Sequence, residues 1–457
     1  MQNKLLRNNI FIITSLLIIY FIFQPQIEHN KYVAQYYFLL FGFLIFSIIY
    51  AISIIRAPSI LIQPLHIFSV FYICIFFLTP LSLIITHKTD CVGVDVMGGC
   101  LKATILVLLS YVAFILGYLR KKGVYLEKKI VCKDLRQQNL ILRYSYVLLV
   151  FAIILNLALL ILIGYNLTFL FTFGGEGLAN VVGIPDNMRF LFNTAYIMLV
   201  PWLFLCAYCK KKIILLISTY FLFVIFFAYG WRFIIYIVSI SGAIVYSRCN
   251  NYKIAIRHIA IGIVALFVYS TITGMVRMSM RKGEITYIEK IEYGDFVYTL
   301  ESNFDIYKTF YGIVNTYPEK YDYYYGEALI GSPIIMWIPR IIWKEKPRGG
   351  EYPLTIAIQK ACGPDALFAS AMSSPNITEY YLDFGSIGIF LFSFLLGRIC
   401  QKMLSLYYSD SIFDLIKYAL FCGFLVQLIN RGYMAQLITL AFFLYIPLVL
   451  YRKFKYD

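Results

Sequence analysis

Long apolar runs separated by short polar segments cover most of this chain, and this pattern predicts its elements. Many of the runs are long enough to cross a hydrocarbon core of roughly 30 Å as a helix. We predict twelve membrane-spanning helices, at 8–24, 36–55, 65–86, 101–119, 142–163, 190–208, 213–229, 233–247, 258–276, 385–404, 413–430 and 435–451. The run at 233–247 is short and contains Gly242. A β-barrel would show short segments of alternating polarity instead. The pattern therefore predicts an all-α polytopic membrane protein.

Composition excludes the soluble alternative. Of the 457 residues, 61% are hydrophobic and only 14% are charged. A soluble domain of this length needs a charged surface, which this chain cannot supply. Lipid is the solvent that requires no such surface.

The basic residues predict the orientation of the helices. If the N-terminus is cytoplasmic, the loop at 120–143 with its eight Lys and Arg residues lies on the same side, as do Lys210–Lys212 and the basic C-terminus. The short loops on the opposite side contain almost no Lys or Arg, which satisfies the positive-inside rule. We therefore expect both termini in the cytoplasm. The net charge of +16 then reports orientation and predicts no nucleic-acid partner.

One interval, 277–384, interrupts the series of spans on the predicted outer side. It divides the chain into a nine-helix membrane region at 1–276, this large outer loop, and a three-helix region at 385–457. A loop this long is usually functional or forms a small domain. Its apolar stretch "YGEALIGSPIIMWIPRIIW" is broken by Gly331, Pro333 and Pro339. We expect this stretch to be an interfacial or re-entrant element, and the loop to contain short helices.

The cysteines leave one question open. Of ten, only Cys91, Cys100 and Cys362 fall on the predicted outer side. Cys91 and Cys100 share one short loop, so a disulfide between them is one of two open alternatives. No Cys/His cluster in the sequence predicts a metal site.

Six arginines are expected near the outer membrane surface, where the positive-inside rule disfavours positive charge. They are Arg232, Arg277, Arg281, Arg340, Arg348 and Arg431. A guanidinium is always charged and binds phosphate oxygens in pairs, so the group predicts a site for a phosphate or diphosphate head group. The alternative for each arginine is a helix cap or a contact with lipid phosphate. In the segment Ile338–Gly350, Lys344 and Lys346 are expected to face a head group as well.

Carboxylates in the outer loop are candidates for acid–base chemistry. Glu301 and Asp305 are one helical turn apart, and Glu379 follows later in the loop. Such a carboxylate can act as a general base toward a sugar hydroxyl. The alternative is structural pairing with the neighbouring arginines.

Several local sequences resemble one family. They are "IPRxxWxxKP" at Ile338–Pro347, the serine-rich entry "SSPNITEYYLDFGSIG" to the tenth span, and an arginine early in the last helical hairpin, Arg431. Together with the twelve spans and the late outer loop, these features resemble the Wzy-type O-antigen and oligosaccharide repeat-unit polymerases of bacteria.

This resemblance implies a membrane glycosyltransferase of the GT-C type, with its active site on the periplasmic side of the inner membrane. It would join oligosaccharide repeat units carried on undecaprenyl diphosphate and release that carrier, in the synthesis of O-antigen in lipopolysaccharide or of a related surface polysaccharide. The resemblance implies no cofactor and no metal. It also implies contact with membrane lipid and a Wzz-type chain-length regulator as a partner.

In this interpretation arginines bind the departing diphosphate, because fixed cations stabilise the charge that develops on it. Glu301, Asp305 or Glu379 would activate the acceptor hydroxyl.

Two other functions share this layout. An O-antigen ligase is expected to use a histidine in the large outer loop, and all four histidines lie outside it. A flippase for lipid-linked oligosaccharide is expected to show repeated halves and polar residues at mid-membrane depth, and the sequence displays neither.

Overall fold

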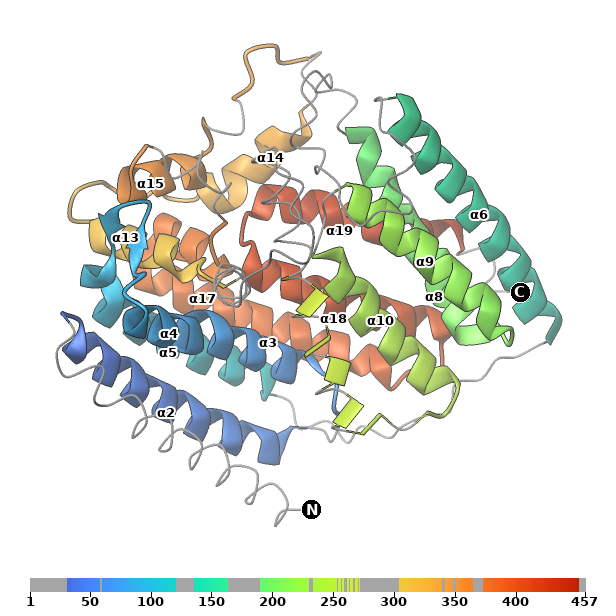
Figure 1. Cartoon of the computed structure of the whole chain (residues 1–457), viewed down its shortest axis with the longest axis horizontal. Helices are drawn as coiled ribbons and strands as arrows, with labels where there is room; N and C mark the ends of the chain where they lie inside the picture. Colours follow the sequence, from blue (N-terminus) through green and yellow to red (C-terminus); the bar gives the residue numbers. More distant parts are fainter. Residues whose placement is uncertain are drawn as a thin grey trace, which may run out of the picture. The chain divides into compact units, whose positions relative to one another are not determined.

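The computed structural model describes residues 31–57, 60–120, 135–162, 190–229, 233–252, 304–338, 342–347, 351–364 and 373–451, and parts of 254–271. Among these residues, seven helices are long and apolar enough to cross a membrane (Figure 1). They are α2 (Val33–Arg56), the helix Pro64–Ile85, the helix Met97–Tyr118, α6 (Leu135–Leu162), the helix Leu191–Tyr208, α17 (Asn376–Tyr407) and α18 (Ile412–Asn430).

Three of these spans are built from consecutive labelled segments. Pro64–Ile85 comprises α3 (Pro64–Ile73), a π-helical turn η1 (Cys74–Leu78) and α4 (Thr79–Ile85). Met97–Tyr118 comprises η2 (Met97–Gly99) and α5 (Cys100–Tyr118), and the third combines η5 (Phe190–Met198) with α8 (Leu199–Tyr208). The junction residues Cys74, Thr79, Cys100 and Met198 have right-handed helical backbone angles, so each apolar run is one continuous helix.

The seven long helices confirm the predicted spans at the corresponding positions, and the all-α membrane class with them. Three shorter apolar helices, α9 (Lys212–Ala228), α10 (Ile234–Cys249) and α19 (Met434–Leu450), match three further predicted spans. The first predicted span, 8–24, and most of 258–276 lie outside the described residues. The total of twelve, the GT-C likeness and the division at 276 and 384 remain predictions.

The chain forms two compact units. The first contains Met1–Tyr125, Phe304–Lys402 and Gln427–Leu437, and the second contains Leu126–Asn303, Met403–Val426 and Ile438–Asp457. The first unit thus combines the early spans with most of the large outer loop and the turn between α18 and α19.

In the first unit, the outer loop is organised around α13 (Tyr307–Thr316). This helix packs against α15 (Pro353–Cys362), η2, the start of α5 and the short strand β1 (Asp90–Cys91) (Figure 1). Almost all of its residues are buried. The approach is close, since a Cβ on Gly99 would overlap the carbonyl of Tyr311. The outer loop is therefore packed directly on the span that begins at Met97.

A two-stranded hairpin lies beside α13. Its strands, β1 and β2 (Val94–Asp95), are joined by Val92 and Gly93, both with positive φ (51° and 82°). This is the geometry that two-residue hairpin turns favour, because its twist matches that of the strands. Gly93 N donates a hydrogen bond to Asp90 Oδ2 at 3.0 Å, which fixes the turn.

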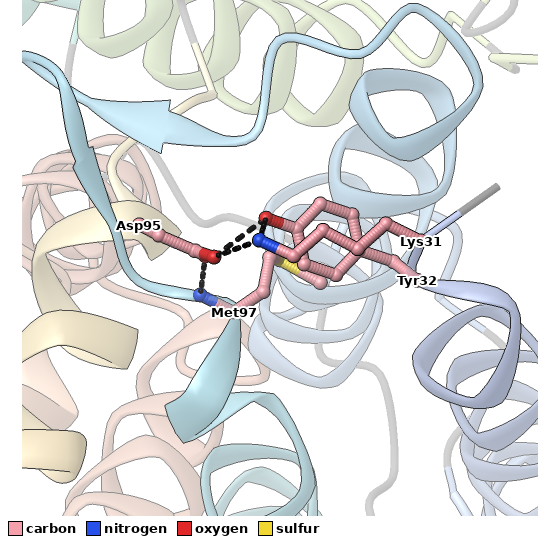
Figure 2. Close-up of polar contacts among 4 residues, drawn as sticks. All are labelled: Lys31, Tyr32, Asp95 and Met97. Atoms are coloured by element: carbon pink, nitrogen blue, oxygen red, sulfur yellow. Dashed lines mark hydrogen bonds and ion pairs between the residues drawn. The ribbon is translucent and has the colours of Figure 1, made fainter.

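Asp95 connects this hairpin to the start of α2. Its Oδ2 accepts hydrogen bonds from Lys31 Nζ at 3.0 Å and Tyr32 OH at 2.7 Å, and its Oδ1 accepts one from Met97 N at 3.0 Å (Figure 2). One carboxylate therefore joins α2, β2 and η2. The ion pair between Lys31 and Asp95 is solvent-exposed, so it contributes little to the free energy of folding and mainly fixes how the segments are oriented.

Helices α5 and α17 cross at a pair of glycines. A Cβ on Gly117 would overlap the carbonyl of Phe394, and a Cβ on Gly397 would overlap the carbonyl of Phe114. Ser110 Oγ and Ser393 Oγ form a buried hydrogen bond of 2.8 Å at the same interface. Small residues that let two backbones approach, with a polar contact between them, are the usual basis of helix association in lipid.

A kink divides α17. Phe384 and Gly385 leave the helical region, and Gly385 has φ 59° and ψ −144°, a conformation that is essentially restricted to glycine. The predicted span 385–404 begins at this kink. The preceding turns, 376–383, contain Glu379 and Asp383.

In the second unit, α6 packs against η5, α8 and α9, and α8 packs against α10 (Figure 1). The ring of Trp202 on α8 occupies the space opened by Gly242 of α10, where a Cβ would be 2.5 Å from its Cη2. Tyr229 OH donates a buried hydrogen bond of 2.7 Å to Asn156 Oδ1 on α6. Gly242, which weakened this span in the sequence, is thus a packing position.

We expect Gly397→Ala to destabilise the protein by about 1–3 kcal/mol, the usual cost of overpacking, because the new methyl group overlaps the Phe114 carbonyl. Gly262→Ala is the matched control, since a Cβ there meets nothing within 4 Å. Thermal unfolding of the detergent-solubilised protein measures both. Equal midpoints for the two variants would contradict the close crossing.

Candidate functional site

The entry to α17 is the point where the outer loop meets the membrane helices of the first unit. Thr309 Oγ1, on α13, donates a hydrogen bond to Ser374 Oγ at 2.9 Å, and Ser374 Oγ donates one to Thr378 Oγ1 at 2.6 Å. All three side chains are buried. This chain of hydroxyls fixes the first turn of α13 against the first turn of α17.

The turn between α18 and α19 is seated on the same entry. Gly432 N donates a hydrogen bond to the carbonyl of Ser374 at 2.8 Å. A Cβ on Gly432 would overlap the backbone of Pro375 and Asn376, so only glycine allows this approach. Arg431, the preceding residue, is exposed, and its backbone N donates to the Gln427 carbonyl at 2.9 Å. Arg431 is therefore presented to solvent by a turn that is itself held in place.

Glu379 fixes the other side of this turn. It is fully buried, and its Oε2 accepts a hydrogen bond of 3.0 Å from Met434 N, the first residue of α19. The N-terminus of a helix has unpaired N–H groups and a partial positive charge, so a carboxylate there is favourable. Its Oε1 has no hydrogen-bond partner in the described part of the chain.

Asp383 has a corresponding role one turn later. Its two carboxylate oxygens accept hydrogen bonds from Ala328 N at 3.1 Å and Leu329 N at 2.7 Å. These amides belong to the first turn of η7 (Glu327–Gly331), which continues into α14 (Ser332–Trp337). The entry segment of α17 thus positions two helix N-termini through two buried carboxylates.

The helix formed by η7 and α14 is the broken apolar stretch of the outer loop. It is short, as the sequence predicts, and it exposes Ile330, Ile334 and Trp337 while it buries Ala328 and Leu329. Lys346 Nζ donates hydrogen bonds to the carbonyls of Met336 at 2.7 Å and Ile338 at 3.0 Å. The structure therefore gives Lys346 the role of a C-terminal cap for α14, and its expected contact with a head group stays a prediction.

Asp305 lies just before α13, two residues ahead of Tyr307. Burial raises the pKa of its carboxyl to about 6, and the positive charge of Lys308 opposes that shift. Lys308 is itself buried. Because Thr309 follows in the same turn, Asp305 belongs to the segment that the hydroxyl chain ties to Ser374.

Three of the predicted site residues therefore lie on segments that meet at Ser374: Asp305, Glu379 and Arg431. The other six lie outside the described residues, and they are Glu301, Arg232, Arg277, Arg281, Arg340 and Arg348. Sequence reasoning missed Thr309 and Gly432, and it noted Ser374 only as part of the serine-rich entry to the tenth span. The only signal for them is the glycine that follows Arg431, which marks a close backbone approach.

The start of α15 approaches the same turn. The rings of Tyr352 and Tyr433 are 5.9 Å apart and nearly perpendicular. Tyr352 immediately precedes α15, and Tyr433 immediately precedes α19. Edge-to-face aromatic pairs of this kind add specific stabilisation to the area that they bury. The outer loop thus contacts the Arg431 turn at two points, through Ser374 and through Tyr352.

Within the described residues, no group of three or more His, Cys, Asp and Glu side chains could hold a metal ion. At the entry to α17, the hydroxyl and carboxylate oxygens form hydrogen bonds with other side chains and with backbone amides. The exposed cation of Arg431 and the raised pKa of Asp305 are the features that suit binding an anion and accepting a proton.

Comparison with known proteins identifies the family. The family model described as O-antigen polysaccharide polymerase Wzy matches residues 9–456, which is nearly the whole chain. Searches of the curated proteins and of the solved structures gave no match. The match extends from the N-terminal membrane region through the outer loop to the end of α19, so it includes every segment of the site. The chain therefore belongs to the Wzy family of O-antigen polysaccharide polymerases, membrane proteins that act on lipid-linked oligosaccharide repeat units.

Proposed function

We propose that this chain joins repeat units carried on undecaprenyl diphosphate, at the periplasmic face of the inner membrane. A growing glycan would be transferred from one carrier to the terminal sugar of a second carrier-linked repeat unit. The bond between the anomeric carbon and the diphosphate breaks, and a bond forms between that carbon and the acceptor oxygen. Undecaprenyl diphosphate departs as an anion, and the acceptor hydroxyl loses its proton.

The observation that carries this proposal is the meeting of three segments at Ser374. A fixed turn that presents Arg431 to solvent sits beside the helix that follows Asp305. The reaction needs a cation for the departing diphosphate and a base for the incoming hydroxyl. A cation held in place before the reaction stabilises the developing charge without reorganisation.

In this proposal Arg431 binds the departing diphosphate. For Arg232, Arg277, Arg281, Arg340 and Arg348, which lie outside the described residues, the assignment to diphosphate binding stays the prediction made from the sequence. Arg348 precedes Tyr352 by four residues in the sequence, and Tyr352 contacts Tyr433 beside the Arg431 turn. This short connection supports a shared site for Arg348 and Arg431.

We assign the general base to Asp305, with Glu301, four residues earlier in the sequence, as the alternative. Asp305 is partly exposed, and its raised pKa of about 6 makes its carboxylate a stronger base than an ordinary aspartate. Glu379 suits a positioning role better, because it is fully buried and one of its oxygens already accepts the Met434 amide hydrogen bond.

The cellular setting of the proposal follows from the charge pattern and the family. Both termini would lie in the cytoplasm, and the large outer loop would lie in the periplasm. A Wzz-type chain-length regulator is the proposed partner, and membrane lipid surrounds the helices. The reaction as proposed needs no cofactor, because the energy of transfer comes from the sugar–diphosphate bond.

Arg431→Ala is expected to lower polymerisation about 100-fold or more, in line with the loss of one donor to a developing anion. In a strain without its own copy of the gene, most lipid-linked glycan would then carry a single repeat unit on gels. Arg143→Ala is the matched control, since Arg143 is an exposed arginine on the predicted cytoplasmic side. A full-length ladder from Arg431→Ala at normal membrane levels would refute the role of this arginine.

Asp305→Asn should lower the rate by about 100- to 10,000-fold, the usual contribution of a general base. For the unchanged protein, the rate should fall about tenfold per pH unit below pH 6, because protonation of the carboxyl at its pKa of about 6 removes the base. An ordinary aspartate would lose its charge only near pH 4. Polymerisation by membrane vesicles between pH 5 and pH 8 measures this. A flat profile across that range contradicts the assignment.

Glu379→Gln separates positioning from base catalysis. The amide oxygen of glutamine can still accept the hydrogen bond from Met434 N, so we expect a near-normal glycan ladder. Glu379→Ala removes the acceptor, and we expect a lost ladder together with a destabilisation of about 1–3 kcal/mol from the orphaned amide. If Glu379 is the base, the glutamine variant is inactive although it is as stable as the unchanged protein.

A further inference from the structure

Two cysteines far apart in the sequence meet in the first unit. Cys91 ends β1 and Cys362 ends α15, and both are buried. Both elements pack against α13, where the absence of a side chain at Gly312 leaves space for Cys362 on one side and Val96 on the other. A Cβ added to Gly312 would be 3.0 Å from Cys362 Sγ and 3.3 Å from Val96 Cγ1, just beyond the hairpin.

The hairpin register brings the two thiols together. Cys91 is paired with Val94 across the hairpin. A Cβ added to Gly363, the residue after Cys362, would be 3.6 Å from Val94 Cγ2. Val94, the partner of Cys91 across the hairpin, therefore lies beside Gly363, and the Cys91 and Cys362 side chains are hydrogen-bonded to each other.

The third cysteine of the predicted outer side has different neighbours. Cys100 is the first residue of α5; its carbonyl accepts a hydrogen bond from Thr104 Oγ1 at 2.8 Å, and its thiol lies beside Tyr311 and Thr104. Cys91 therefore lies beside Cys362, whereas Cys100 lies beside Tyr311 and Thr104. The short loop shared by Cys91 and Cys100 suggested a local pair, but the hairpin turns Cys91 toward α15.

We propose that Cys91 and Cys362 form a disulfide bond that joins the hairpin to α15. This inference rests on the proposed function in one respect, the periplasmic location of the outer loop, since disulfides form and persist in that compartment. Two S–H bonds break and one S–S bond forms. The two protons and the two electrons pass to the disulfide of a thiol–disulfide oxidoreductase, which becomes a dithiol.

The bond would form during folding, before α15 covers the hairpin. The hydrogen bond with Cys362 and burial both raise the pKa of the Cys91 thiol, and it is the thiolate that attacks a disulfide. In the folded protein the reduced pair is therefore unreactive. Oxidation has to precede or accompany the closure of α15 over β1.

The bond would secure one end of α15, whose other end lies beside the Arg431 turn. Asp95 in β2 fixes the hairpin to the start of α2. At its beginning α15 contacts Tyr433 through Tyr352. A covalent link at Cys362 would thus connect the early spans to the element that borders the proposed anion site. Because it closes a long loop, it removes much conformational freedom from the unfolded chain.

The test counts the cysteines that reduction exposes. Full-length protein is purified in detergent, denatured in SDS with N-ethylmaleimide, reduced, and then treated with a maleimide polymer that shifts its mobility on a gel. We expect two polymer chains per protein for the unchanged chain and for the control Cys100→Ser. We expect none for Cys91→Ser and none for Cys362→Ser.

Peptide mass spectrometry of the unchanged protein keeps the test independent of the folding of any variant. A non-reduced digest should contain one peptide with Cys91 linked to one with Cys362. Digests in which both cysteines carry N-ethylmaleimide overturn the inference. So does a two-chain shift that disappears in Cys100→Ser, because the bond would then join another pair. The glycan ladder of the same strains separates the two hypotheses, since a full ladder without the disulfide contradicts this inference alone.

Discussion

The hydrogen bond from Gly432 N to the Ser374 carbonyl is the contact on which the proposed site depends. It joins the turn after α18 to the outer loop, two parts of the chain that are separated in sequence by all of α17 and all of α18. The absence of a side chain at Gly432 makes the approach possible. Ser374 is in turn linked to α13, because its Oγ accepts a hydrogen bond from Thr309 Oγ1. Any larger residue at position 432 would separate Arg431 from the segment that contains Asp305.

Buried polar groups at the entry to α17 give this contact its rigidity. Glu379 and Asp383 bind the N-termini of α19 and η7, so the exposed elements of the outer face are oriented from one buried segment. Buried polar groups are costly unless they are hydrogen-bonded, and Glu379 Oε2 and both Asp383 oxygens accept such bonds. The kink at Gly385 lets these turns leave the axis of the span that follows. The proposed chemistry would thus be supported by the ends of membrane helices, which are rigid.

The sequence predicts the membrane spans well and the site only in part. Apolar runs define spans because lipid imposes a minimum length, and the run at 65–86 matches Pro64–Ile85 within a residue. The predicted span begins at residue 385, whereas α17 begins at Asn376 and its first turns contain Glu379 and Asp383. Glu379 accepts a hydrogen bond from the distant backbone N–H of Met434, and Lys346 donates one to the Met336 carbonyl at the end of α14. The periodicity of apolar residues does not predict contacts between segments far apart in the sequence. The contact between Cys91 and Cys362 could not be predicted for the same reason.

The central claim is that glycan transfer and release of undecaprenyl diphosphate are one reaction performed by this chain. The most direct measurement uses the purified protein in lipid vesicles with lipid-linked repeat units extracted from a strain that lacks a polymerase. Released undecaprenyl diphosphate and new glycosidic linkages are counted together by mass spectrometry. The proposal predicts one released carrier for every linkage formed, with no added nucleotide. Linkages without carrier release, or a requirement for a nucleotide sugar, would contradict it.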